Sequence, residues 1–539
     1  MEFLVNAAPP CVLFEDDHLL VVNKPAGMNT HAPSPFSGEG LYDWLRHREP
    51  RWASLAILHR LDKDTSGVML FGKSDLANHS LTQQFTAHTL HKQYILETDH
   101  AVRPDTFTVT SALVRAGDKY VSRPVFPGGD TAETRFTVLS REGNRTVVRA
   151  EPITGRTHQI RVHAADRGFP ILGDTRYGGT PAARVYLHAA QISLTHPGTN
   201  QPVTFKAEPH FSAHPNLALR RAVITPEATN AFRLLHGAAD GWPGWYVDRL
   251  GNYLLSQSEQ PLSDRQQAEL WRLGESFAVP SQEAILGTYH KILSREIRHL
   301  RAEDASPRLC AGTTAPERFG IRENGVQFEL SMGEGYSVGL FLDQRDNRRR
   351  LLSGHVAAGI RLPQTGARLL NVFAYTCGFS VCAALGGFAT TSLDLSKKYL
   401  DWGRRNFSLN GLDPAQHDFI FGDAFDWLKR LAKKGRKFDV IVLDPPTFSQ
   451  SRERGVFRAE KDYGRLAEAA LPLLLPGGIL LASTNAAGLE PERFLEMLQG
   501  GVQRSGRDWV ASHYVPQPPD FPVTRQEPAY LKTVWVKVG

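Results

Sequence analysis

The sequence predicts a multi-domain α/β chain, with an α+β domain on a mostly antiparallel sheet, a small α/β linker domain and a doubly wound C-terminal domain. Two observations lead to this prediction. The chain has 539 residues, which is several times the size of an ordinary domain. Its pattern changes twice, from short β-like runs to a mixed region and then to strands that alternate with helices. We place the domains at residues 1–212, 213–318 and 319–539.

The composition excludes several classes of protein. With 41% hydrophobic and 22% charged residues, the chain matches a globular protein rather than a disordered or fibrous one. It contains no apolar run long enough to span a membrane, and its first residues lack the pattern of a secretory signal. The four cysteines fit neither a disulfide framework nor a paired metal site, so we expect a cytoplasmic protein without a metal ion. A net charge of +6 weakly favours a polyanionic partner.

In the first region, short β-like runs outnumber helical patterns, which favours an antiparallel sheet. The predicted helices are Leu41–Arg48 and Leu76–Thr86. The predicted strands are Leu19–Val22, Gly67–Phe71, Tyr94–Leu96 and Thr146–Val148. A polar stretch over about residues 209–230 is predicted to connect this region to the next.

The other two regions differ in periodicity. The middle region combines a predicted strand, Tyr253–Gln257, with a helical pattern near Arg265–Phe277. In the last region, helices beginning at Gly378 and covering Lys397–Leu409 and Ala424–Ala432 separate four predicted strands, Arg368–Phe373, Thr391–Leu395, Asp418–Phe421 and Val440–Leu443. This alternation is typical of parallel βαβ units in a Rossmann-like sheet.

The segment 59–67 (HRLDKDTSG) comes directly before a predicted strand. Asp62 in this loop can be held firmly while its oxygens face a cleft. The alternative is that Asp62 caps a turn and Gly67 only supplies a positive φ. Arg161 lies on one face of a strand predicted over 157–163. It is a candidate to pair with Asp62 and to keep that carboxylate ionised as a nucleophile.

Tyr94 offers a ring that can stack on a base. With these residues, the strings at 14–27 (FEDDHLLVVNKPAG), 172–178 (LGDTRYG) and 187–189 (LHA) resemble the RNA pseudouridine synthases that carry an HRLD-x-x-TSG signature. The resemblance covers about residues 10–205. It implies that Asp62 is the nucleophile, Tyr94 the active-site tyrosine and Arg161 the partner of Asp62, and we place Arg60 and His158 at the substrate. It also implies isomerisation of a uridine that leaves its stack, without cofactor or metal.

The C-terminal region places acidic residues at the ends of successive predicted strands. The segment Asn371–Gly378 combines a strand, a small-residue turn and a helix, which can cradle a nucleotide-like ligand. Asp394, Asp423 and Asp444 follow the next three strands. We expect Asp394 to bind ribose hydroxyls and Asp423 to contact an adenine edge. Each aspartate alone could be a helix N-cap, but their joint spacing favours a nucleoside pocket.

This region resembles the class I S-adenosylmethionine (SAM)-dependent methyltransferases, and more closely the branch that acts on large-subunit ribosomal RNA. The strings that carry the likeness are 339–348 (GLFLDQRDNR), 371–378 (NVFAYTCG), 444–449 (DPPTFS) and 481–485 (LASTN), with 233–237, 240–244 and 247–249 in the middle region. The resemblance covers about residues 230–535 and implies SAM as cofactor. The residues expected to bind it are Asn371, Phe373, Tyr375, Gly378, Asp394, Asp423 and Asp444.

The cysteine positions bear on which atom is methylated. Methylation of a pyrimidine ring carbon generally needs a thiolate, and the relatives that do this carry a cysteine near position 484, where this chain has Thr484. We expect Cys377 to have a packing role. The sequence is more similar to relatives that methylate a guanine ring nitrogen, with Asp444 orienting the acceptor, Phe448 packing on the base and Asn485 bonding its edge.

The remaining charged motifs are ambiguous. The arginine triplet 348–350 and the arginine pair 404–405 either touch phosphate or form solvated helix faces, and we favour the solvated faces. His79, His88 and His91 lack the spacing of metal ligands. We therefore predict a bifunctional RNA-modifying enzyme with ribosomal RNA as partner. The alternatives are a chain with one active half and one RNA-binding half, and a non-catalytic ribosome assembly factor.

Overall fold

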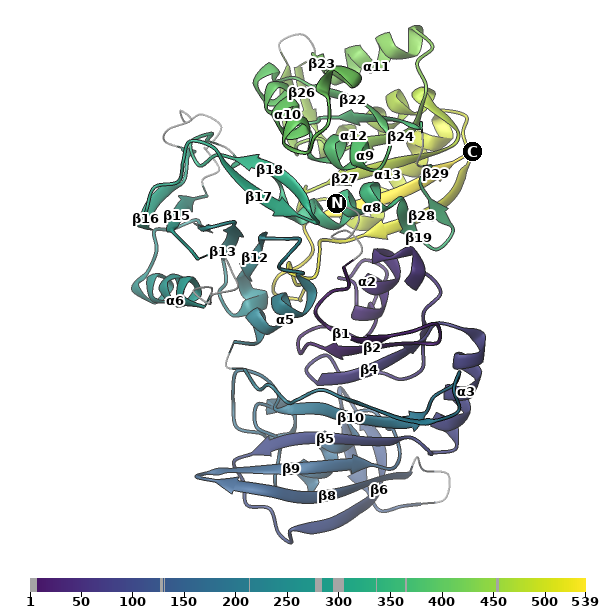
Figure 1. Cartoon of the computed structure of the whole chain (residues 1–539), viewed down its shortest axis with the longest axis vertical. Coiled ribbons are helices and arrows are strands. Elements are labelled where there is room, and N and C mark those ends of the chain that lie inside the picture. Colours follow the sequence, from purple (N-terminus) through teal and green to yellow (C-terminus); the bar gives the residue numbers. More distant parts are fainter. Residues whose placement is uncertain are drawn as a thin grey trace.

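The computed structural model describes residues 7–539 except 127–128, 130, 213, 277–283, 294–304, 336, 364–365 and 452–454. Three sheets organise the chain (Figure 1): an N-terminal sheet at one end of the long axis, a C-terminal sheet at the other, and a smaller middle sheet to one side. Among the described helices, none is long and apolar enough to cross a membrane.

The N-terminal sheet has eleven strands in the order β1-β2-β4-β10-β5-β9-β8-β6-β7, with β3 beside β4 and β11 beside β10. Among the strands that the structure describes in this sheet, only β4 and β10 pair in parallel, so the predicted, mostly antiparallel sheet is confirmed. The strands are β1 (Val12–Glu15), β2 (Leu19–Lys24), β3 (Ala56–Ile57), β4 (Ser66–Gly72), β5 (His91–Thr98), β6 (Thr106–Ala116), β7 (Lys119–Arg123), β8 (Thr131–Glu142), β9 (Arg145–Pro152), β10 (Leu187–Thr195) and β11 (Pro202–Lys206).

Gly67 has a specific reason to be glycine. Its φ is +120°, and a Cβ there would lie 2.3 Å from the carbonyl oxygen of Ala189 on β10. The residue therefore allows the close parallel approach of β4 and β10, directly after the Asp62 loop.

Two predicted helices are present as α2 (Leu41–Arg48) and α3 (Asp75–Thr86). The predicted strand over 157–163 is wrong, because this segment begins the helix α4 (Gln159–Asp166). The Gln159 side chain stabilises the first turn by accepting from the backbone N–H of Arg156 at 3.0 Å. The pattern of apolar and polar residues over these eight positions is compatible with either a helix or a strand. The helix buries Ile160 and Ala164, which are four positions apart, on the same face.

The middle sheet has the order β12-β13-β14-β15-β16. Its strands are β12 (Ala231–His236), β13 (Trp245–Leu250), β14 (Tyr253–Ser258), β15 (Gly287–Ile292) and β16 (Arg308–Gly312), and the helix α6 (Asp264–Glu275) accompanies them. The stretch 209–230 is more than a connection, because it contains α5 (Pro215–Val223) with Leu217 and Val223 buried. One apolar core joins Leu20 and Trp44 of the N-terminal part to Trp245 of the middle part.

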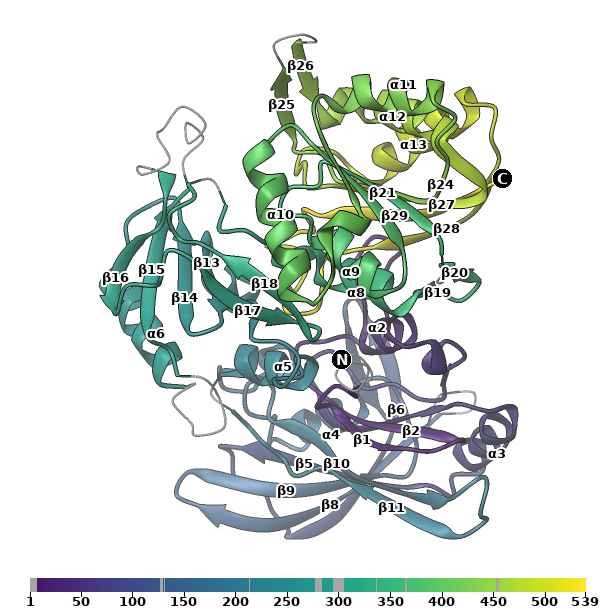
Figure 2. The same cartoon turned by 45° about the horizontal axis from the view of Figure 1, so that its top comes forward.

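The C-terminal sheet has the order β23-β22-β21-β24-β27-β29-β28. Figure 2 labels five of its strands, β21, β24, β27, β28 and β29. Its first five strands are parallel, and β29 and β28 are antiparallel additions. The strands are β21 (Arg368–Val372), β22 (Ala389–Asp394), β23 (Asp418–Phe421), β24 (Phe438–Leu443), β27 (Leu474–Thr484), β28 (Trp509–Val515) and β29 (Lys532–Val538). The helices are α9 (Gly378–Leu385), α10 (Lys397–Leu409), α11 (Ala424–Lys433), α12 (Ala459–Ala470) and α13 (Pro491–Arg504). The predicted Rossmann-like fold is confirmed.

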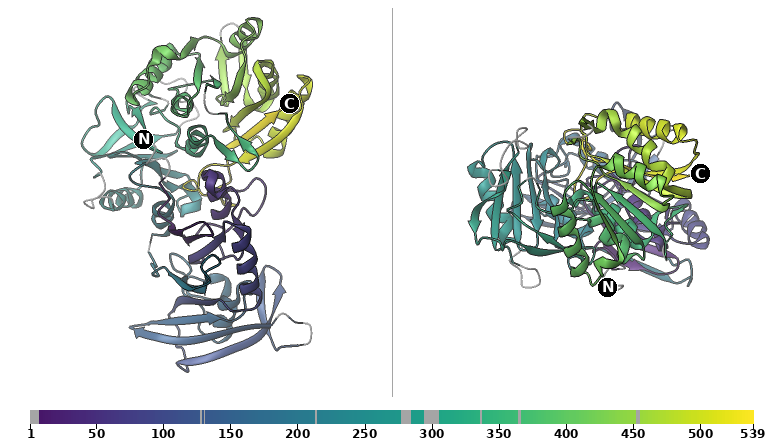
Figure 3. Two further views of the ribbon diagram at one scale, coloured as in Figure 1. Left: turned by 45° about the vertical axis from the view of Figure 1, so that its right-hand side comes forward. Right: turned by 90° about the horizontal axis from the view of Figure 1, so that it is seen from above.

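Short elements complete the C-terminal part. They are the hairpins β17–β18 (Phe319–Glu323 and Val326–Leu330), β19–β20 (His355–Ala357 and Ile360–Arg361) and β25–β26 (Phe448–Ser451 and Gly455–Arg458), and the helix α8 (Arg345–Ser353). Helix α8 and β19 lie against α2 of the N-terminal part, and the left view of Figure 3 shows how this junction connects the two ends of the molecule.

The arginines of α8 do not form the expected solvated face. Arg348, Arg349 and Arg350 are each at most 3% exposed. Arg348 forms two hydrogen bonds to Glu323, while Arg349 pairs with Glu49 of the N-terminal part. Buried guanidinium groups are tolerated only with such partners. Arg349 and Arg350 are therefore part of the packing between the two ends of the chain, with Glu49 and Glu39 as partners, whereas Arg348 is buried against Glu323 within the C-terminal part.

The second arginine run behaves differently. Arg404 forms an exposed pair with Asp401 within α10, and Arg405 pairs with Glu329 of β18. These two residues match the expected solvated helix face.

Two candidate active sites

The first site is the N-terminal cavity, a space of about 540 Å³ around the loop between β3 and β4. Its walls include every residue that the sequence placed at the uridine site: Arg60, Asp62, Tyr94, His158 and Arg161. The Asp62 side chain is 24% exposed, so its carboxylate is open to a ligand.

Arg161 links Asp62 to a second carboxylate. Its Nη1 donates to Oδ2 of Asp62 at 3.1 Å, while Nε and Nη2 donate to Asp174 at 2.7 and 2.8 Å. Burial alone would lower the pKa of Arg161, but Asp174 and then Asp62 outweigh it and raise that pKa above its usual value. The guanidinium is thus a permanent cation that orients Asp62.

The sequence analysis missed Asp174 and Lys24. Asp174 is 1% exposed and holds the Nε and Nη2 atoms of Arg161, while Nη1 is left for Asp62. Lys24, at the end of β2, is fully buried and donates to the backbone carbonyls of Pro25, Met28 and Lys63. It ties the Asp62 loop to the neighbouring turn. Both residues lie in strings that carried the family resemblance, which was the available signal.

The other predicted residues surround Asp62. His158, at a left-handed φ of 56° before α4, has its Nε2 3.8 Å from Oδ2 of Asp62 and its Nδ1 2.7 Å from the Tyr177 hydroxyl. Burial lowers the pKa of His158, so this ring is neutral at pH 7. Burial, and then the charge of Asp62, raise the pKa of Tyr94. Arg60 donates to the Thr157 hydroxyl at 2.9 Å.

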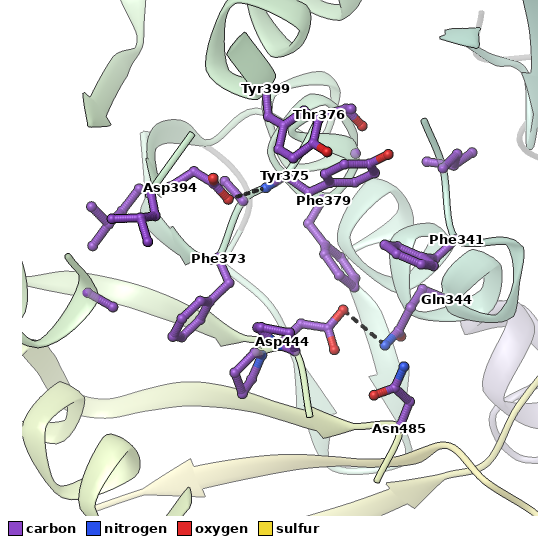
Figure 4. Close-up of a pocket in the computed structure, with 18 of the residues that line it drawn as sticks. Phe341, Gln344, Phe373, Tyr375, Thr376, Phe379, Asp394, Tyr399, Asp444 and Asn485 are labelled. Carbon is purple, nitrogen blue, oxygen red and sulfur yellow. Dashed lines mark hydrogen bonds between the residues drawn. The ribbon is translucent and has the colours of Figure 1, made fainter. Parts of the chain in front are cut away.

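The second site is the C-terminal cavity, a space of about 300 Å³ at the carboxyl ends of the parallel strands. Figure 4 shows Asp394 and Asp444 in different parts of this cavity, with aromatic rings around them. These rings belong to Phe341, Phe373, Tyr375, Phe379 and Tyr399.

At one end of this cavity, the backbone fixes Asp394. Its two carboxylate oxygens accept from the N–H groups of Tyr375 and Ser396, each at 2.8 Å, and burial raises its pKa. The adjoining turn is strained: Phe373, Tyr375 and Cys377 have φ values of 63°, 49° and 63°. Left-handed conformations of bulky residues cost about 1–3 kcal/mol each and cluster at functional sites.

At the other end, Asp444 follows β24. Gln344 donates to its Oδ2 at 3.3 Å and to the Ser483 hydroxyl at 2.7 Å. Burial, and then the neighbouring Asp343, raise the pKa of Asp444 to about 7. Asn485, which the sequence assigned to the acceptor base, is exposed and lies in the same wall.

Two of the predicted residues lie outside the lining of the cavity. Asn371 is fully buried outside the lining and donates to the Ser380 hydroxyl at 2.9 Å. Phe448 begins the β25–β26 hairpin and is also outside the lining. Asp423 both lines the cavity and caps α11 by accepting from the N–H of Asp426 at 3.2 Å, so the two roles considered for it coexist. Gly378, at the start of α9, lines the cavity as expected.

None of the four cysteines lines either cavity as the structure describes them. Cys11, Cys377 and Cys382 are buried and Cys310 is exposed on β16. Burial raises the pKa of all four thiols, so each stays protonated at pH 7. Cys377 packs against α10, where Gly403 leaves room for its sulfur.

Potential metal ligands gather elsewhere. Within the described residues, one group of three was found, namely Glu39, His47 and His513, between α2 and β28. His47 bonds Glu39 at 2.5 Å. Burial alone would raise the pKa of Glu39, but His47 and then Arg350 outweigh it and lower that pKa to about 2. The group lies at the junction of the two ends of the chain, outside both cavities.

The fold and the two cavities define a chain with an RNA-isomerase type of site at one end and a Rossmann-like methyl-transfer type of site at the other. Comparison with known families agrees. Residues 18–166 match the model of RNA pseudouridylate synthases, and residues 232–536 match that of S-adenosylmethionine-dependent methyltransferases. The chain belongs to the SAM-dependent methyltransferase family and joins to it an RNA pseudouridine synthase.

Individual relatives support both halves. A ribosomal RNA large subunit methyltransferase of Deinococcus radiodurans is 34% identical over 330 residues, which cover 60% of this chain and 77% of the relative. The ribosomal large subunit pseudouridine synthase C of Yersinia pestis is 38% identical over 231 residues, covering 40% of this chain and 71% of the relative. A solved structure from Streptococcus mutans, assigned as a SAM-dependent methyltransferase, has 29% identity, a TM-score of 0.50 and coverage of 64% and 87%.

The C-terminal cavity suits SAM. Asp394 is a carboxylate that can accept ribose hydroxyls, the aromatic walls can hold an adenine ring, and Asp444 when ionised can offer negative charge to a sulfonium. A further solved methyltransferase with 29% identity and a TM-score of 0.50 is complexed with SAH. SAM is therefore the cofactor of the C-terminal half.

Proposed function

We propose that both halves act on RNA of the large ribosomal subunit, in the cytoplasm: Asp62 in the isomerisation of a uridine, and Asp444 in methylation of a base, with a guanine ring nitrogen favoured. The observation that carries this proposal is that each half keeps a complete cavity with an oriented aspartate, Asp62 held by Arg161 and Asp444 held by Gln344. A half that had lost its activity and only bound RNA would not need an oriented aspartate in its cavity.

In the N-terminal cavity, Asp62 acts as the nucleophile. Arg161 keeps its carboxylate charged and directed into the open space. The bond between the ribose and the base nitrogen breaks, and a bond from the ribose to a base carbon forms. The proton that leaves this carbon is balanced by the proton that the freed nitrogen gains, so the step needs no co-reactant. Tyr94 supports the base while it is out of its stack.

In the C-terminal cavity, SAM supplies an electrophilic methyl group. The protein orients an acceptor that already has a lone pair, with Asp444 and Asn485 in the wall that the acceptor meets. Attack through a ring carbon would require a thiolate, and all four thiols of the chain are kept protonated outside the cavity. A ring nitrogen is the acceptor that fits these residues.

The cysteines provide a direct test of the acceptor. A variant with all four replaced, Cys11→Ala, Cys310→Ser, Cys377→Ala and Cys382→Ala, should retain methyl transfer within about threefold of wild type. Cofactor binding by calorimetry controls for folding. A variant that binds SAM normally but no longer methylates RNA would contradict nitrogen methylation and indicate a covalent thiolate adduct.

The two activities are tested by matched variants of the full chain. Asp62→Ala should abolish pseudouridine formation and leave methylation unchanged, whereas Asp444→Ala should do the reverse. Both are assayed on large-subunit RNA from cells that lack this protein, with modified nucleosides mapped by mass spectrometry. Loss of both products in both variants would contradict two independent sites, and absence of any product in the wild type would favour an assembly factor.

A further inference from the structure

The wall of the N-terminal cavity carries more basic than acidic side chains. Asp62 is the only carboxylate among the described residues of this wall, whereas Arg60, Lys92, Arg156 and Arg161 are basic. Asp62 and Asp174 engage only Arg161 of these four. The base and the ribose of a uridine are uncharged, so they do not account for the excess of positive charge. The negatively charged part of an RNA is its phosphate backbone.

Lys92 is the basic side chain of this wall that lacks a counterion. In the part of the chain that the structure describes, its ammonium group forms no hydrogen bond and no ion pair. The side chain is partly buried, and this burial lowers the pKa of Lys92 with no nearby carboxylate to oppose it. A cation withdrawn from water without a counterion is costly. Lys92 therefore points to an anion that arrives with the substrate.

Gly155 keeps the ammonium group of Lys92 accessible. Gly155 is exposed, and its φ lies outside the left-handed region, so its backbone conformation does not require glycine. A Cβ at this position would meet one heavy atom within 4 Å, namely Nζ of Lys92 at 3.6 Å. A branched side chain would therefore cover the ammonium group. The glycine leaves Nζ open to a ligand in the cavity.

The position of Lys92 relative to the reaction centre suits a phosphate. Lys92 and Tyr94 are two residues apart on β5, so both side chains point to the same face of the strand. Two residues of a strand span about 7 Å, and both side chains line the cavity around Asp62. Each ribose of an RNA strand is joined directly to two phosphates. A uridine with its base at Tyr94 and its ribose at Asp62 therefore brings a phosphate toward Lys92.

We propose that Lys92 binds a backbone phosphate next to the target uridine, and that Gly155 provides the opening through which the phosphate reaches it. This inference rests on the pseudouridine synthase function proposed above. The phosphate lies on the 5′ side or on the 3′ side of the uridine, and both have the same chemistry. The contact positions the nucleotide after it leaves its stack and is independent of the RNA sequence.

The first test removes the charge from each partner in turn. Lys92→Met lacks the ammonium group, and a short RNA around the mapped uridine carries one uncharged methylphosphonate linkage, on the 5′ or the 3′ side. For one of these two linkages, wild type should bind the neutral RNA at least tenfold more weakly than the unmodified RNA, whereas Lys92→Met should bind the two within about twofold. That linkage identifies the phosphate. Equal binding of all three RNAs by wild type, or full sensitivity to the same linkage in Lys92→Met, would overturn the proposal.

Salt dependence provides an independent measure of the same contact. In Lys92→Met, the slope of log affinity against log salt concentration should be smaller by about 0.7, the value for one phosphate of a single strand. Lys206→Met, at an exposed position of β11, should keep the wild-type slope. Lys92→Arg retains the charge and should recover most of the affinity that Lys92→Met loses. An unchanged slope in Lys92→Met would contradict a phosphate contact.

The second test covers the ammonium group and leaves Lys92 in place. Gly155→Val should raise KM for RNA in pseudouridine formation at least tenfold, with kcat within threefold of wild type. Gly320→Val, at an exposed glycine of β17 with no heavy atom within 4 Å of its Cβ, is the matched control and should behave as wild type. Methyl transfer by the same full-length variants controls for folding. A fall in kcat with KM unchanged would assign Lys92 to the chemical step and overturn the proposal.

The outcomes separate this inference from the function on which it rests. If the wild-type protein forms no pseudouridine in large-subunit RNA, the proposed function of the N-terminal half fails. If it forms pseudouridine and Lys92→Met has the wild-type KM, the function stands and the role proposed for Lys92 is wrong.

Discussion

Arg161 and Asp174 form a two-bond ion pair at 2.7 and 2.8 Å, and this pair leaves one guanidinium nitrogen for Asp62. Asp174 is 1% exposed, so the pair is shielded from solvent. The orientation of the nucleophile therefore depends on a carboxylate that does not line the N-terminal cavity.

Replacing Asp174 by asparagine should impair pseudouridine formation without affecting methylation. The amide offers one acceptor oxygen in place of two, so the guanidinium of Arg161 is no longer held in one plane. The carboxylate of Asp62 then loses its fixed orientation. We expect the rate to fall about 100-fold, equivalent to about 2.7 kcal/mol. Asp166→Asn, an exposed change at the end of α4, the helix that carries Arg161, should leave the rate unchanged. Equal rates for the two variants would show that Arg161 needs no second partner.

Lys24→Met should disturb the Asp62 loop and leave binding of the cofactor unchanged. The substitution removes the donor shared by three backbone carbonyls beneath the Asp62 loop, and each unsatisfied buried group costs about 1–3 kcal/mol. We expect a lower unfolding temperature and at least a tenfold loss of pseudouridine formation, with SAM affinity unchanged. Lys206→Met, at an exposed position of β11, is the control. An active and equally stable Lys24→Met protein would contradict this role.

Methylation should depend on pH through Asp444. Its pKa is raised to about 7, and the ionised form stabilises the positive charge that the acceptor base gains. The rate should therefore rise as the pH increases from 6 to 8 and then level off. Asp444→Asn should be slow and lack this inflection. A wild-type rate that is flat over this range would contradict the assignment.

The same raised pKa predicts an effect on stability. Asp444 favours the folded state fully below its ordinary pKa of 3.8 and loses this contribution as the pH rises through about 7. Asp444→Asn should therefore unfold at a higher temperature than wild type at pH 8 and at the same temperature near pH 4. Thermal unfolding at both values checks the sign.

The junction of the two halves should be sensitive to Glu49. Glu49 and Arg349 are each 3% exposed and pair across the junction. Removing one partner of a buried pair costs about 3–5 kcal/mol, so Glu49→Gln should lower stability to urea markedly. Glu496→Gln breaks an exposed pair with Arg493 and should cost at most about 1 kcal/mol. Similar losses in both variants would show that the junction pair contributes little.

Much of this molecule was predictable from local sequence. Strands with strong apolar runs, such as β4 and β24, were found because their pattern does not depend on distant partners. Asp62, Tyr94 and Arg161 share one cavity, and Asp394 and Asp444 share another, as the motif order suggested. The sequence and the structure agree on where these residues lie, and the roles of these residues remain predictions.

The errors have physical reasons. The α4 segment is too short for its period to decide between helix and strand. The burial of Arg349 depends on Glu49, 300 positions away, and no local pattern reveals such a partner. Lys92 was missed for a similar reason, because Gly155 comes from a distant part of the sequence and lies beside its ammonium group only in the folded chain.

The buried junction between α2 and α8 also has a consequence for the order of events on RNA. Trp44 of the N-terminal half donates to Asp346 of the C-terminal half at 3.0 Å. The spacing of the two reaction centres is therefore set by packed side chains and not by a flexible linker. A single transcript seated at both centres in one encounter must present its two target nucleotides at that separation. Nucleotides that lie closer or farther apart would have to be visited in turn, with release and rebinding between them.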